Sequence, residues 1–214
     1  MNPNERIDYP KQRLRKAQLC SDPHDQFTQW QENMMSFGRE EAFNAKAFHL
    51  STVSSEAKPS SRMVLMHNFT KDGLVFFTNY NSQKGRELAS NPFVCALFWW
   101  PESCRQIRIE GAVQKVSPTE SDEYFFSRPF KSQVASTISQ QSEAIPSFDV
   151  LLSEFDSFVE SYNYSTSVSR PDHWGGYLIK PVRYEFWQGS SHRLSDRFEY
   201  QWGNGEWSIT RLSP

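Results

Sequence analysis

The stretch EFWQGSSHRLSDR, residues 185–197, begins as an apolar, aromatic strand and breaks at a Gly-Ser turn before a histidine and two arginines. Trp187 offers a flat face, and Arg193 and Arg197 each offer a planar fork of hydrogen-bond donors. The glycine in the turn lets the backbone come close to a ligand. These residue types suit a flat, anionic, heteroaromatic ligand. A hairpin whose arginines are solvated would contain the same residues, so the rest of the chain has to separate the two interpretations.

The length of 214 residues is that of one domain, or of one domain with extensions, and it allows a full hydrophobic core. We expect residues 1–20, which are basic with few apolar anchors, to form a flexible N-terminal arm or lid. Residues 21–214 are expected to form a single domain. Aromatic residues make up 15% of the chain, so this core is expected to be built from Phe and Trp.

Several classes of protein are excluded by composition. The net charge of −2 argues against nucleic-acid binding through electrostatics. No apolar run approaches the roughly 20 residues of a membrane span, and the first 16 residues lack the apolar segment of a secretory signal. The three scattered cysteines lack metal-ligand spacing and the five histidines are unclustered. We therefore expect reduced thiols, a cytoplasmic location and no metal site.

Short β-type runs separated by short helices dominate the pattern. Strands are expected at about 45–54, 61–67, 74–79, 93–100, 104–116, 174–180, 182–188, 198–202 and 206–212. Helices are expected at 22–37, after Ser82, at 117–128, at 131–138 and from Ser147 to about Val159. Antiparallel connections dominate and βαβ alternation is absent. The expected fold class is therefore α+β, with the strands forming a barrel or packed sheets.

Two places on the chain offer anion-binding chemistry. The segment 82–86, SQKGR, follows a strand and opens a short helix, where free N–H groups and the helix dipole favour a phosphate. Tyr124, Arg128 and Ser132 are four residues apart and would offer a phenol, a guanidinium and a hydroxyl to a phosphate if they face one way. Pro129 interrupts that helix. The alternative in both places is an ordinary solvated helix surface.

The order of motifs along the chain resembles the pyridoxine/pyridoxamine 5′-phosphate oxidase family. The matching motifs are RMVL (62–65), FTN (77–79), SQKG (82–85), RQIRIEG (105–111), YFFSRP (124–129), SQQS (139–142), WGG (174–176), the stretch 185–197 and the terminal RLSP (211–214). The resemblance implies a homodimeric, mainly antiparallel split β-barrel with short peripheral helices that holds FMN at the subunit interface. It also implies an oxidase that uses O₂ to convert pyridoxine or pyridoxamine 5′-phosphate to pyridoxal 5′-phosphate and peroxide.

The same resemblance assigns the site residues. The implied FMN contacts, several of them from the partner chain, are Arg62, Met63, Val64, Leu65, Phe77, Thr78, Gln83, Lys84, Gln106, Gln141, Ser142, Trp187 and Arg197. The implied substrate contacts are Arg6, Tyr9, His67, Tyr124, Arg128, Ser132, Arg193 and Ser195. Arg62 and Lys84 would hold the FMN phosphate. Arg193 would cover the substrate ring and Arg197 would stabilise the reduced flavin, so these two are the expected catalytic residues.

Three positions depart from the family pattern. His67 stands where the family usually has a lysine on the substrate phosphate, and Ser195 replaces a histidine that helps to orient the substrate. Gln83 replaces an arginine beside the FMN phosphate, which removes a charge-assisted contact of about 1.5–3 kcal/mol. Two further interpretations stay open: a flavin oxidase of the same fold that acts on another small ring compound, such as the phenazine-type oxidases, and a non-catalytic paralogue that binds FMN or pyridoxal phosphate.

Overall fold

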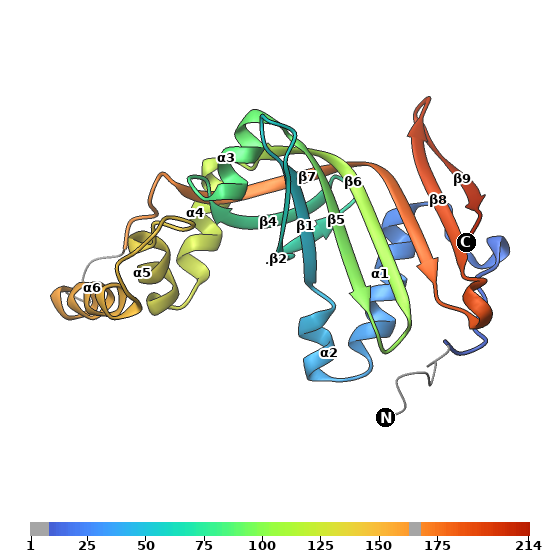
Figure 1. Ribbon diagram of the computed structural model, residues 1–214, viewed down its shortest axis with the longest axis horizontal. Coiled ribbons are helices and arrows are strands. Elements are labelled where there is room, and N and C mark those ends of the chain that lie inside the picture. The colour runs from blue at the N-terminus through green and yellow to red at the C-terminus, as the bar shows by residue number, and fades with distance from the viewer. Residues whose placement is uncertain (1–8, 163–167) are drawn as a thin grey trace.

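The computed structural model describes residues 9–162 and 168–214 and is built on one antiparallel sheet (Figure 1). The strands of the described residues are β1 (Ala47–Val53), β2 (Pro59–Leu65), β3 (Asn68–Thr70), β4 (Gly73–Asn79), β5 (Phe93–Trp100), β6 (Arg105–Lys115), β7 (Trp174–Gln188), β8 (Asp196–Gly203) and β9 (Glu206–Leu212). Their order is β2-β1-β5-β6-β7-β4-β3, and β8 pairs with both β7 and β9. Together with the helices, this sheet confirms the α+β class.

The helices of the described residues are α1 (Pro23–Met35), α2 (Arg39–Asn44), α3 (Gln83–Ser90), α4 (Pro118–Ser127), α5 (Phe130–Ile138) and α6 (Phe148–Ser161). Helix α1 begins as expected, because the side chain of Asp22 caps it and Pro23 occupies its first turn. Figure 1 shows α4, α5 and α6 together beyond one end of the sheet. Among the described residues, no helix combines the length and the apolar character that a membrane crossing needs.

Aromatic side chains fill the core, as expected. Phe48, Phe98 and Trp100 are completely buried, and the ring of Phe98 lies 5.2 Å from that of Phe48 and 5.0 Å from that of Phe27. Such ring pairs add stabilisation of about 0.5–1.5 kcal/mol beyond the area they bury. The apolar stripe of α1 supplies Phe27 to this core. The helix was predicted to reach residue 37, but Phe37 lies beyond the end of α1 and is 54% exposed.

Strand β7 is one continuous strand of 15 residues, whereas the sequence predicted two strands separated at Pro181. The register between β6 and β7 shifts between Glu110 and Gly111, and Gly111 pairs with Pro181. This bulge accommodates the proline inside the ladder. A Cβ atom on Gly111 would lie 2.1 Å from the carbonyl oxygen of Lys180, so the bulge requires glycine there.

The described part of the N-terminal segment packs against the C-terminal strands β7 and β8. Asp196 at the start of β8 accepts hydrogen bonds from the Arg13 side chain at 2.8 Å and from the Leu14 backbone at 2.9 Å. Leu14 is buried, and the hydroxyl of Tyr200 donates to the carbonyl of Cys20 at 2.8 Å. The C-terminal half of the expected arm at residues 1–20 is thus anchored on β8. The mobility of the arm stays a prediction.

Candidate functional site

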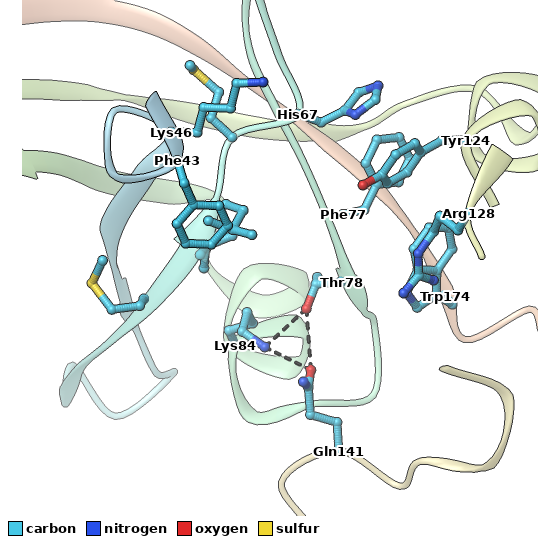
Figure 2. Close-up of a pocket in the computed structure, with 14 residues that line it drawn as sticks. Phe43, Lys46, His67, Phe77, Thr78, Lys84, Tyr124, Arg128, Gln141 and Trp174 are labelled. Atoms are coloured by element: carbon cyan, nitrogen blue, oxygen red, sulfur yellow. Dashed lines mark hydrogen bonds between the residues drawn. The ribbon is translucent and has the colours of Figure 1, made fainter. Parts of the chain in front are cut away.

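An open cavity of about 440 Å³ lies where β2, β4, the start of α3 and the end of α4 meet (Figure 2). This volume is within the range of small-molecule sites. The predicted cofactor contacts that line it are Met63, Val64, Leu65, Phe77, Thr78, Lys84 and Gln141. The predicted substrate contacts that line it are His67, Tyr124 and Arg128. The structure therefore gathers residues from both predicted groups around one cavity.

One corner of the cavity is built around the ammonium group of Lys84. Its Nζ donates to Gln141 Oε1 at 2.9 Å, Thr78 Oγ1 at 3.0 Å and Ser82 Oγ at 3.2 Å, as Figure 2 shows for the first two. Burial, and then the charge of Arg62, lower the pKa of Lys84 to about 8. Among the described residues Lys84 has no carboxylate partner within salt-bridge distance. A buried cation that is surrounded by neutral oxygens suits an incoming anion.

The backbone of α3 brings Lys84 to this corner. Ser82 caps the helix, and its hydroxyl accepts from the Gly85 N–H. A Cβ atom on Gly85 would lie 2.1 Å from the carbonyl oxygen of Tyr80, so only glycine lets the first turn approach the preceding loop this closely. The predicted helix start after β4 is present in the structure, and anion binding there stays a prediction.

Another side of the cavity, away from Lys84 in Figure 2, carries Tyr124 and Arg128. The guanidinium of Arg128 lies 4.8 Å from the ring centre of Trp174 and donates to Ser136 Oγ at 2.8 Å. The Tyr124 ring lies 4.0 Å from the ring of His67, and burial lowers the pKa of His67. The predicted Tyr-Arg pair thus meets at the cavity, whereas Ser132, on α5, is not among the lining residues.

Several lining residues were not in the predicted site: Phe43, Lys46, Met66 and Trp174. Phe43 belongs to α2, a short helix that the sequence analysis missed. Lys46 directly precedes β1, and its carbonyl accepts from the Met66 backbone at 2.8 Å. Trp174 was quoted only as part of the WGG motif. Strands β5 and β6 separate Trp174 from the FTN motif in sequence, yet Trp174 pairs with Asn79 in the sheet. Sequence spacing does not show this pairing.

A second group of predicted residues lies at the other end of the molecule, at the end of β7 and the start of β8. Gln106, Trp187 and Arg197 are neighbours across β6, β7 and β8. The ring of Tyr9 lies 5.6 Å from the ring of Trp187. Figure 1 shows this end of the sheet far from α4, along the longest axis of the molecule. On one chain, the residues of the stretch 185–197 therefore do not line the cavity.

Within this second group, buried Glu185 holds Arg197 through its Nε at 2.8 Å and Arg108 at 2.8 Å. Arg193 lies in a short 3-10 turn, Ser191–Arg193, with a φ of 61°. Ser195, which was predicted to depart from the family pattern, is buried. Of the remaining predicted residues, Ser142 follows Gln141 with a φ of 76°. Arg62 and Gln83 are not among the residues that line the cavity. Arg62, whose charge acts on Lys84, is paired with Glu87, and Gln83 precedes Lys84 at the start of α3. Arg6 falls outside the described residues.

A curled antiparallel sheet with peripheral helices, and a cavity with a cationic corner beside an aromatic wall, define the class of split-barrel flavin-binding proteins. Residues 39–160 match the family described as pyridoxamine 5′-phosphate oxidase. Residues 174–214 match the pyridoxine 5′-phosphate oxidase C-terminal dimerisation region. The chain belongs to the pyridoxamine 5′-phosphate oxidase family. The family expected from the motifs is confirmed, and with it the expectation of an FMN-dependent oxidase.

Similar proteins support this assignment along the whole chain. A pyridoxine/pyridoxamine 5′-phosphate oxidase of Microcystis aeruginosa is 45% identical over 210 residues, which are 98% of this chain and 96% of that protein. The chloroplastic pyridoxine/pyridoxamine 5′-phosphate oxidase 1 of Arabidopsis thaliana is 41% identical over 98% of this chain, and the match spans 40% of that longer protein.

Solved structures agree on the fold. PhzG from Burkholderia lata 383, in complex with tetrahydrophenazine-1-carboxylic acid, superposes with a TM-score of 0.86 at 27% identity. The match covers 96% of this chain and all of that chain. A pyridoxamine 5′-phosphate oxidase-related, FMN-binding protein of Nostoc punctiforme has a TM-score of 0.69 at 15% identity, over 86% of this chain and 95% of that one, and supports the fold alone. The expected split-barrel architecture is confirmed.

Proposed function

We propose that this chain is an FMN-dependent oxidase that converts pyridoxine 5′-phosphate and O₂, or pyridoxamine 5′-phosphate, O₂ and water, to pyridoxal 5′-phosphate and hydrogen peroxide, with ammonia released from the amine. The observation that carries the proposal is that one cavity has cationic groups on different sides. Lys84 and Arg128 lie on different sides of it in Figure 2, with the aromatic ring of Phe77 also in the lining. Two phosphorylated ring compounds, a cofactor and a substrate, would need two such groups. We further propose a cytoplasmic homodimer with FMN at the subunit interface.

The residues present fit FMN. The Lys84 corner offers a buried ammonium and the hydroxyl of Thr78 to a phosphate, and Arg62 adds a second cation nearby. Met63, Val64 and Leu65 on β2 would flank the ring system, and Met63 and Leu65 are about half exposed on a single chain. Bound FMN would supply hydride acceptance and the reaction with O₂. The protein would bind both rings and orient them.

The second group of residues would complete the site from the partner subunit. Trp187 and Arg197 lie at the far end of the same chain, within the region that matches the dimerisation segment. In a homodimer, these residues of the partner can reach the cavity. Arg197 would then stabilise negative charge on the reduced flavin, and Arg193 would cover the substrate ring.

A second candidate function is a flavin oxidase that acts on another small ring compound. The observation that favours it is the state of His67, whose pKa is lowered by burial and whose ring packs on Tyr124. This position therefore supplies no fixed positive charge for a substrate phosphate at neutral pH. The structural likeness to PhzG points in the same direction. Tyr124 and Arg128, which both line the cavity, favour the phosphorylated substrate.

One assay separates these candidates. The purified protein is examined for a flavin absorption spectrum, then supplied with pyridoxamine 5′-phosphate in air while aldehyde and peroxide are followed. We expect a yellow protein and both products in equal amounts. A protein that cannot be loaded with FMN would exclude both oxidase functions. A flavoprotein that is inactive on this substrate but releases peroxide with another ring compound would support the second candidate.

A further inference from the structure

The carboxylate of Glu87 lies buried on α3, behind the cationic corner of the cavity. Its Oε2 accepts hydrogen bonds from the hydroxyls of Thr52 and Ser60, the latter at 2.7 Å, and a longer one directly from Arg62 Nη2 at 3.4 Å. Its Oε1 accepts from the side-chain amide of Gln83 at 2.9 Å. Glu87 is not among the residues that line the cavity. None of the roles assigned so far uses this carboxylate.

The direction of each hydrogen bond in this cluster is fixed by chemistry. A guanidinium can only donate, so Thr52 and Ser60 must accept from Arg62, whose nitrogens lie 2.5 Å from each hydroxyl oxygen. An ionised carboxylate can only accept, so the single proton of each hydroxyl must point to Glu87. Each hydroxyl thus donates to Glu87 and, for that reason, presents its oxygen as an acceptor to Arg62. With the carbonyl of Leu50 as a further acceptor at 3.1 Å, the guanidinium is held in one orientation.

We propose that Glu87 is a positioning residue for the cofactor phosphate, which fixes Thr52 and Ser60 as acceptors and, through them, the guanidinium of Arg62. The inference rests on the proposed function, in which Arg62 and Lys84 hold that phosphate. Glu87 itself touches no ligand. Without its carboxylate, both hydroxyls are free to turn their protons toward Arg62, and the guanidinium loses its preferred orientation.

The charge state of the cluster agrees with this role. Burial alone would raise the pKa of Glu87, but hydrogen bonds from Thr52, Ser60 and Gln83 and the charge of Arg62 lower it to about 2. The carboxylate is therefore ionised across the physiological range. Gln83, which stands where the family usually has an arginine, donates its amide to the other oxygen of Glu87. Gln83, which is uncharged, thus helps to hold the carboxylate of Glu87 in place.

The test compares two ligands that differ only in the phosphate. The affinities of the FMN-free full chain for FMN and for riboflavin are measured by flavin fluorescence for wild type, Glu87→Leu and Glu87→Gln. We expect Glu87→Leu to weaken FMN binding by at least tenfold and riboflavin binding by less than twofold. Glu87→Gln keeps a carbonyl oxygen that accepts from both hydroxyls, so it should retain most of the preference for FMN. Glu143→Leu, which removes an exposed carboxylate paired with Arg86, is the matched control.

Two further measurements test the same positioning role. If Glu87→Leu does not fold, the variant Thr52→Val with Ser60→Ala removes the relay and should show the same selective loss of FMN affinity. In an Arg62→Ala background, Glu87→Leu should have no additional effect on the FMN-to-riboflavin ratio. An unchanged ratio in both Glu87→Leu and the hydroxyl variant would overturn the positioning role while leaving the proposed function intact. A wild-type chain that binds FMN no better than riboflavin would instead overturn the phosphate site itself.

Discussion

Among single residues, Lys84 has a lowered pKa from which the pH dependence of cofactor binding can be predicted. A phosphate dianion favours the protonated amine, and the pKa of Lys84 in the ligand-free protein is lowered to about 8 by burial and by Arg62. We expect the affinity for FMN to be nearly constant below about pH 8 and to fall by up to about tenfold per pH unit above it. Fluorescence titration between pH 6.5 and 9.5 measures this, and riboflavin serves as the control ligand. Parallel pH curves for FMN and riboflavin would contradict the prediction.

The lowered pKa of Lys84 also affects the free energy of unfolding, and this effect changes with pH in the direction opposite to that of FMN affinity. Because the folded pKa of Lys84 lies below its unfolded value of 10.5, the unfolded chain holds the extra proton between about pH 8 and 10.5. The contribution of Lys84 to the free energy of unfolding therefore rises with pH in this window. The difference between wild type and Lys84→Met isolates it, since other titrating groups cancel. Stability of the ligand-free protein and affinity for FMN should thus change in opposite directions.

His67 predicts the response of the substrate site. Burial lowers its pKa, so at neutral pH it offers no fixed charge to a phosphate beside Tyr124 and Arg128. His67→Lys adds a charge-assisted contact of about 1.5 kcal/mol, which corresponds to roughly tenfold. We expect the KM for pyridoxamine 5′-phosphate to fall accordingly, as steady-state kinetics will show. Pyridoxamine without phosphate should gain nothing, and a KM that is unchanged at every pH would place His67 outside the phosphate site.

Among the structural elements, the bulge between β6 and β7 leaves no room for a side chain at Gly111. A methyl group on Gly111 would meet the carbonyl oxygen of Lys180 at 2.1 Å, and that backbone is fixed by the ladder. We expect Gly111→Ala to reduce the free energy of unfolding by about 2 kcal/mol or more. Gly203→Ala in β8, where a Cβ meets nothing within 4 Å, should change it by less than about 0.5 kcal/mol. Urea unfolding compares the two, and equal losses would show that the bulge tolerates a side chain.

The elements also show what sequence patterns can and cannot supply. Alternating apolar residues and helix caps predicted most strands and the helix starts at Pro23, Gln83 and Pro118, because these signals are local. The continuity of β7 through Pro181 was missed, since the bulge that admits the proline depends on β6. Helix α2 was missed as well, because its six residues are too few for a periodic pattern. Because that helix was not predicted, Phe43 was absent from the predicted site.

The residues of the candidate site also differ in whether a local sequence signal could predict them. Tyr124 and Arg128 were paired from their helical spacing, and the structure places both at the cavity. Lys84 was singled out from its place in the first turn of a helix. Trp187 and Arg197 could be assigned only through resemblance, since no local pattern shows which cavity they serve. Their distance from that cavity on one chain is a property of the whole molecule.

At the scale of the whole molecule, the two separated groups of site residues make a prediction about assembly. If each site combines the Lys84 corner of one subunit with Arg197 of its partner, Lys84→Ala and Arg197→Ala each damage a different half of every site. Arg197→Ala leaves Glu185 paired with Arg108 at 2.8 Å, so the loss does not orphan a buried carboxylate. Both homodimers should therefore fold, and both should be nearly inactive.

A mixed dimer of these two variants has one site that carries both substitutions and one site that carries neither. Random exchange of equal amounts makes about half of the dimers mixed, so the mixture should regain about a quarter of the wild-type rate of peroxide formation. The measurement requires co-refolding or co-expression, with unmixed variants treated identically as the control. Sites built within single subunits would gain nothing from mixing, because every chain would still carry its own lesion. A quarter of the activity, recovered from two inactive proteins, can arise only if residues of both chains meet at one flavin.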